Sequence, residues 1–175
     1  MLIQLDKQIK KLDEYRAGTL KTGLKLGIPR LDNHMRFKYS SLNIVLGHAN
    51  VGKTSVLLYL MTLYSMKHDI KWLVFSSENE CYTLYRKILE FLEGQVFNKI
   101  EESVYKERIK WIDEHFKFVD ASKIYTYKSL LDLAQHVKKA WDYQGFIIDP
   151  WNSLAKDKEK LKGSSSYEYN YEALS

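Results

Sequence analysis

Apolar residues follow two kinds of pattern, one close to the N-terminus and another from residue 42 onward. In the first, apolar residues recur every three or four positions among lysines and acids, at Leu2, Leu5, Ile9, Leu12 and Tyr15. This spacing predicts an amphipathic helix with one narrow apolar face. The face can pack on the chain's own domain or on a neighbouring subunit, and the local pattern favours neither.

From residue 42 onward, short apolar runs alternate with longer amphipathic segments. The short runs predict buried strands at 42–46, 71–76, 116–119 and 146–149. The longer segments predict helices at 53–67, 83–92, 104–115 and 128–143, the last with Leu130, Leu131, Ala134, Val137 and Trp141 toward the core. Because parallel strands need crossover connections, this alternation predicts an α/β fold, a mostly parallel sheet with helices on both faces.

Length and composition limit the number of domains. With 175 residues, 45% of them hydrophobic, and only 8 Gly and 2 Pro, the chain has enough apolar surface for one packed domain. We expect an N-terminal helical arm at 1–20 and a single domain at 21–175. Lysine and arginine number 27 against 22 acidic residues, and the net charge of +5 is compatible with a polyanionic partner without establishing one.

Cysteine and hydropathy exclude several classes of protein. Cys81 is the only cysteine, so the chain has no internal disulfide, and one thiol with five scattered histidines does not make a zinc site. The first residues are polar, and no apolar run approaches the ~18 residues that span a membrane. We therefore expect a cytoplasmic protein, from a bacterial or phage-infected cell, that has no membrane partner.

A phosphate-binding motif lies between the first predicted strand and helix. The segment GHANVGKT, residues 47–54, fits the pattern G-x-x-x-x-G-K-[ST] in the strand and helix context that this pattern requires. Its backbone N–H groups are expected to surround the phosphates, while Lys53 contributes charge and Thr54 a hydroxyl ligand to Mg²⁺. The expected nucleotide-binding residues are Gly47, His48, Ala49, Asn50, Val51, Gly52, Lys53, Thr54 and Ser55, with no specific chemistry assigned to His48 or Asn50.

Acidic residues follow two of the predicted strands. Asp149 ends the strand at 146–149, where a carboxylate can hold Mg²⁺ through water beside the phosphates. Glu78 follows the strand at 71–76 and can act as the base for an attacking water, although Glu80 is a competitor by spacing. After Asn152, the lysines between 156 and 162 can contact a phosphate backbone, but the interleaved acids are equally typical of a solvated loop.

Together these segments resemble the RecA-fold ATPase domain of hexameric replicative helicases, in the phage and mitochondrial Twinkle-like branch related to the bacterial DnaB type. The resemblance covers about residues 22–175. The segment TGLKLGIPRLD at 22–32 is similar to the T-G and L-D pattern before the family's first strand. The segment SSEN at 76–79 resembles its S-x-E motif, and IIDPWN at 147–152 resembles its I-D-P-W-N strand.

The resemblance implies a role for each matching residue. Lys53 and Thr54 would hold the phosphates and Mg²⁺ of ATP, Asp149 would hold the metal, and Glu78 rather than Glu80 would activate water, so that Glu78 and Lys53 are the catalytic residues. It further implies that a loop at 156–166 contacts single-stranded DNA in the channel of a ring. The N-terminal helix resembles the linker that joins neighbouring subunits.

Family members continue beyond this point with further strands, a nucleotide-sensing residue and an arginine finger. We therefore expect a partial RecA-like P-loop NTPase core whose C-terminal strands are missing, and whose hydrolysis depends on a completed ring. One alternative is a stand-alone nucleotide-binding module that docks on another ATPase and hydrolyses ATP weakly or not at all. A RecA-like ATPase of recombination or signalling is a third hypothesis, which the I-D-P-W-N strand disfavours.

Overall fold

The computed structural model describes residues 5–18 and 23–156. The chain divides into two compact units, Met1–Asn43 and Ile44–Ser175. The boundary expected between residues 20 and 21 stays a prediction.

The first unit begins with the predicted N-terminal helix, α1 (Leu5–Arg16), and contains a second short helix, α2 (Pro29–Asp32). The described apolar residues of the α1 face are between 45% and 71% exposed: Leu5, Ile9, Leu12 and Tyr15. The amphipathic helix predicted from the spacing of apolar residues is therefore confirmed as α1. Its exposed face leaves both predicted packing partners possible.

Asp32, the aspartate of the T-G and L-D pattern, stabilises a turn in this unit. The side chain is buried, and its two carboxylate oxygens accept hydrogen bonds from the N–H groups of Leu26 and Gly27, each at 2.7 Å. An antiparallel bridge between Leu24 and Phe37 closes the same segment. The L-D part of the pattern therefore stabilises a turn by charge-assisted hydrogen bonds to backbone donors.

The second unit contains a three-stranded parallel sheet with strand order β2-β1-β3. In chain order its elements are α3 (Lys53–His68), β1 (Trp72–Ser76), α4 (Cys81–Glu93), η1 (Phe97–Lys99), α5 (Glu102–His115), β2 (Phe116–Phe118), α6 (Tyr127–Ala140), β3 (Gly145–Asp149) and η2 (Trp151–Ser153). The predicted α/β class is confirmed at this level.

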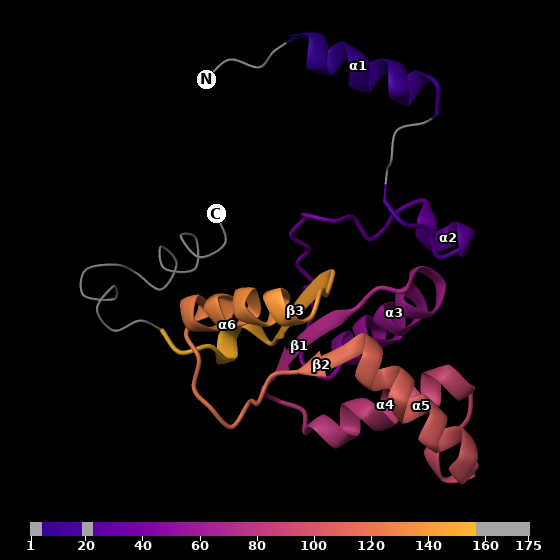
Figure 1. Ribbon diagram of the computed structural model, residues 1–175, viewed down its shortest axis with the longest axis vertical. Coiled ribbons are helices and arrows are strands. Elements are labelled where there is room, and N and C mark those ends of the chain that lie inside the picture. The colour runs from indigo at the N-terminus through magenta and orange to yellow at the C-terminus, as the bar shows by residue number, and fades with distance from the viewer. Residues whose placement is uncertain (1–4, 19–22, 157–175) are drawn as a thin grey trace. The chain divides into compact units, whose positions relative to one another are not determined.

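Helices cover both faces of this sheet. Figure 1 shows α6 on one side of the strands, and α4 and α5 on the other. All five residues of β1 are buried, as expected for a central parallel strand. The helices contribute side chains that are at most 3% exposed, including Leu58, Met61, Leu84, Ile88, Ile112, Leu130 and Ala134.

The predicted strand at 42–46 is wrong. These residues form no strand, and Leu42, Ile44, Val45 and Leu46 are between 56% and 87% exposed. An apolar run favours burial, but a strand also needs a neighbour that pairs with its backbone groups, and none of the three described strands pairs with 42–46. The segment therefore enters the glycine-rich loop as irregular backbone.

The expected orientation of α6 is correct for some residues and wrong for Leu131. Leu130 is completely buried and Ala134 is 3% exposed, whereas Leu131 is 42% exposed. Val137 and Trp141 are half-buried. Successive helical residues point about 100° apart, so Leu130 and Leu131 cannot both face the centre of the sheet.

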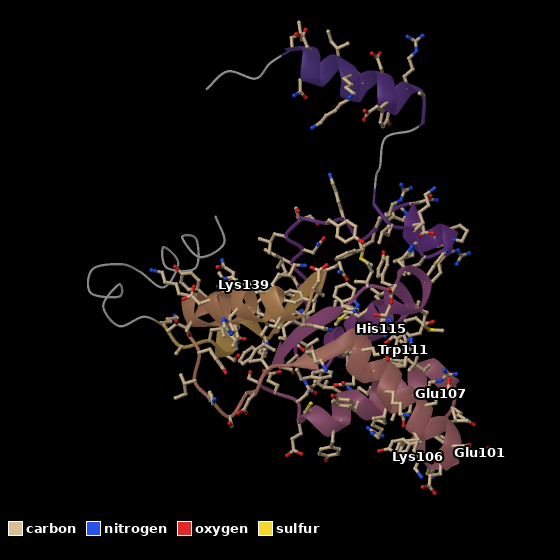
Figure 2. The ribbon with its side chains drawn as sticks, viewed as in Figure 1. Glu101, Lys106, Glu107, Trp111, His115 and Lys139 are labelled. Carbon is tan, nitrogen blue, oxygen red and sulfur yellow. The ribbon has the colours of Figure 1, made fainter. Side chains whose placement is uncertain are left out.

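Trp111 and His115, which Figure 2 labels, hold the C-terminal end of α5 in place. The buried His115 ring stacks on Trp111 with centroids 4.1 Å apart, and its Nδ1 lies 2.8 Å from the Trp111 carbonyl oxygen. Its Nε2 lies 2.8 Å from Oδ1 of Asp69, which caps α3. This histidine therefore joins the C-terminal ends of α3 and α5.

We expect Gly145→Ala to lower the free energy of unfolding by about 1–3 kcal/mol, since overpacking a filled core forces neighbours out of place. Gly145 begins β3 directly opposite Trp72, and a Cβ there would overlap the Trp72 ring. That indole cannot move freely, because its N–H donates to the Met61 carbonyl at 3.2 Å and to the Ser65 hydroxyl at 3.0 Å.

Urea unfolding measures the effect, and a double-mutant cycle with Trp72→Leu is its control. In the Trp72→Leu background, the Gly145→Ala substitution should cost much less. An equal cost in both backgrounds would show that the overlap with the ring is not the cause.

Candidate functional site

Thr54 and Asp149 meet although they lie 95 residues apart in the chain. The Thr54 hydroxyl donates a hydrogen bond to Oδ2 of Asp149 at 2.6 Å. Thr54 is in the first turn of α3, and Asp149 is the last residue of β3. The structure therefore brings the end of the glycine-rich loop to the carboxyl end of an edge strand, as the sequence predicted.

The loop before α3 closes around the side chain of Lys53. Gly52 has φ +90°, a left-handed conformation that glycine adopts without steric penalty, and it caps α3. The Lys53 ammonium group donates to the carbonyl oxygens of Gly47 at 3.0 Å and His48 at 2.6 Å. Lys53 and the N-terminal end of the 16-residue helix thus place positive charge at the mouth of the loop.

The remaining loop residues contribute backbone rather than side chains. His48 supplies a carbonyl oxygen to Lys53, and Asn50 has φ +60°, which asparagine tolerates better than most residues. Ala49 and Val51 are exposed. His48 and Asn50, to which the motif assigned no specific chemistry, therefore stabilise the conformation of the loop.

Glu78 lies in the segment that follows β1. The last residue of β1, Ser76, is paired with Asp149 across the sheet, and the N–H of Ser77 donates to the Asp149 carbonyl at 3.1 Å. Glu78 itself is exposed. The structure therefore places the backbone of Ser77, the residue before Glu78, beside the end of β3.

A cavity of about 430 Å³ lies at the carboxyl ends of β1 and β2. Glu78, Glu80 and Asp120 are among its lining residues, above an apolar floor that includes Leu84 and Phe118. Lys53, Thr54 and Asp149 do not line it. Both glutamates share this cavity, so their positions do not select between them, and the choice of Glu78 stays a prediction.

Asp120 and Cys81, which both line the cavity, have pKa shifts with different causes. The Ser122 hydroxyl and N–H both donate to Oδ1 of Asp120, at 2.7 and 3.0 Å, and these hydrogen bonds lower the pKa of Asp120. Burial raises the pKa of the Cys81 thiol. At neutral pH the cavity rim therefore carries an ionised Asp120, and Cys81 stays a neutral thiol.

One contact beside the loop, between Lys87 and Ser55, could not be predicted from the sequence motifs. Lys87 of α4 donates a hydrogen bond to the hydroxyl of Ser55, the residue after Thr54, at 3.1 Å. Lys87 is nine positions beyond Glu78, inside a helix whose pattern predicts only packing. No sequence pattern indicates this contact, because it depends on how α3 and α4 pack against each other.

No protein-family model, curated protein or solved structure matches this chain. The resemblance to replicative helicases therefore rests on the motifs quoted above. Within residues 5–18 and 23–156, none of the helices combines the length and apolar character needed to cross a bilayer. Of the loop expected to contact DNA, Lys156 is described, whereas 157–166 lie outside the described residues.

Proposed function

We propose that the chain binds ATP with Mg²⁺ at the loop 47–55 and is the ATPase domain of a replicative DNA helicase. The observation that carries the proposal is the contact between the Thr54 hydroxyl and the Asp149 carboxylate. It joins the two motifs that the family uses for phosphate and metal. A glycine-rich turn without function would not need a carboxylate from a strand 95 residues away.

Thr54 and Asp149 fit a magnesium ion. Both offer oxygen, and the Thr54 hydroxyl donates to Oδ2 of Asp149 at 2.6 Å, so the hydroxyl oxygen would contact the ion and the carboxylate would hold it through a water molecule. No group of three His, Cys, Asp or Glu residues in the described parts of the chain could hold a metal alone. Phosphate and water oxygens would complete the shell, as is usual for Mg²⁺.

The remaining residues would act on the phosphates. The N–H groups at the start of α3 and the Lys53 ammonium would bind the phosphate oxygens, in exchange for the carbonyls of Gly47 and His48. Glu78 would accept a proton from the water that attacks the γ-phosphorus as the bond to the β-phosphate oxygen breaks. The S-x-E resemblance supports Glu78 for this role over Glu80.

Translocation on single-stranded DNA would take place in a ring of subunits. The apolar face of α1 would contact the neighbouring subunit, a role that rests on the resemblance of this helix to the family's linker. DNA contact through 156–166 rests on the resemblance alone. In this proposal Mg²⁺ supplies charge that compensates the phosphates, and the chain supplies orientation.

Replacing Asp149 tests the proposal. We expect Asp149→Asn to weaken ATP binding by about 10- to 100-fold in Mg²⁺, since losing a contact made by a charged group costs on the order of 1.5–3 kcal/mol. In EDTA the variant and the wild type should bind alike. Titration calorimetry with ATP and ADP measures both conditions.

Asp142→Asn is the matched control, because Asp142 is 81% exposed and pairs with Lys138 away from the loop. That variant should bind as tightly as the wild type. A wild-type chain that binds neither ATP nor ADP in Mg²⁺ would disprove the proposed function.

A further inference from the structure

Lys87 is held against the start of α3 by the packing of two helices. Its ammonium group donates to the Ser55 hydroxyl at 3.1 Å in a partly buried position. One turn further along each helix, Tyr59 and Phe91 make an edge-to-face ring contact with centroids 5.3 Å apart. Because both contacts advance in the same direction, α3 and α4 run side by side, and the place of Lys87 is set by the fold.

This position is electrostatically unfavourable for a lysine. A helix N-terminus carries the positive end of the helix dipole, so cations are disfavoured there and anions are favoured. Lys53 already adds one positive charge to the first turn of α3. Among the ion pairs of residues 5–18 and 23–156, none joins Lys87 to a carboxylate.

We infer that Lys87 is a positioning residue of the phosphate site, a role that rests on the proposed function. Through Ser55, Lys87 holds the turn that carries Thr54, and its charge adds to the attraction for a polyphosphate. Helix α4 begins at Cys81, directly after the segment with Glu78. Lys87 therefore connects the element that follows the proposed base to the loop that binds the phosphates.

Four variants of the 175-residue chain separate charge, hydrogen bond and packing. Lys87→Met removes the charge and keeps most of the stem, Lys87→Arg keeps the charge, and Ser55→Ala removes the acceptor. Lys106→Met is the control, because Lys106 pairs with Glu102 on the surface of α5, where Figure 2 labels it. The probes are ATP and ADP with Mg²⁺, titrated at low and high salt, with the melting temperature of each protein measured without nucleotide.

We expect Lys87→Met to bind ATP roughly tenfold more weakly at low salt, and the difference to shrink as salt screens the charge. Lys87→Arg should retain most of the affinity. Ser55→Ala should lose less than Lys87→Met, with a smaller dependence on salt. Lys106→Met should match the wild type, and Lys87→Met should melt within a few degrees of it.

Three results would overturn the inference. If the wild type binds ATP with Mg²⁺ and Lys87→Met binds it equally tightly at low salt, Lys87 has no role while the proposed function stands. If Lys87→Met and Lys87→Arg lose affinity equally and both melt much earlier, the role is only structural. If the wild type binds no nucleotide, the inference and the proposed function fail together.

Discussion

Lys53→Ala is expected to lower the affinity for ATP with Mg²⁺ by about 100-fold or more, which corresponds to roughly 2.7 kcal/mol. A hydrogen bond to a charged group contributes about 1.5–3 kcal/mol, and Lys53 would make such bonds to the phosphates in place of two loop carbonyls. The alanine variant leaves the positive end of α3 and the Lys87 ammonium group as the remaining attractions for the ligand. Titration calorimetry or a fluorescent nucleotide analogue measures the change.

The control for this substitution is Lys139→Ala, on an exposed position of α6 that Figure 2 labels. It removes the same charge from the protein without touching the loop, so it should bind ATP like the wild type. Equal losses in both variants would indicate a general effect of net charge. Normal binding by Lys53→Ala would show that the phosphates are held elsewhere.

Leu130→Ala is expected to lower the free energy of unfolding by about 2–5 kcal/mol, as usual when a buried leucine is truncated and a cavity remains. Leu130 is completely buried between α6 and the sheet, whereas its neighbour Leu131 is 42% exposed. Leu131→Ala should change stability by no more than about 0.5 kcal/mol. Urea unfolding of the two variants is the measurement, and similar losses would contradict the orientation of α6.

The success of the pattern for helices and strands has a local cause. The helix predicted at 104–115 is observed as α5, and the strand predicted at 71–76 is observed as β1, with ends shifted by one or two residues. Residues three or four apart in a helix share a face, and short apolar runs suit a strand buried on both faces. These are properties of neighbouring residues, which the sequence displays directly.

The failures arise where a residue depends on a distant partner. The run at 42–46 is as apolar as β3, yet it has no strand beside it and stays exposed. Leu130 and Leu131 are identical residues, and only the direction in which α6 faces the sheet distinguishes them. Burial of a side chain is decided by what packs against it, not by its own hydrophobicity alone.

In the candidate site, too, some features could be predicted from the sequence and others depend on distant partners. The phosphate motif and the aspartate at a strand end were visible in the sequence. The rule that parallel strands end at one sheet edge does not account for their contact, because the residues before the loop, 42–46, form no strand. The contact between Lys87 and Ser55 was not visible, because it depends on the packing of α3 against α4. The positions of Glu78 and Glu80 in one cavity likewise left the choice between them to the resemblance.

By itself, the sequence determined the α/β alternation, the approximate extent of the longer helices and of the three strands, and the residues of the candidate site. Those features depend on periodicity and on short motifs, which operate over a few positions. The tertiary structure alone decided that 42–46 is not a strand, that Thr54 lies 2.6 Å from Asp149, and that Lys87 stands at the start of α3. Such contacts depend on how the crossover helices bring distant segments together, and a local pattern does not encode their distances.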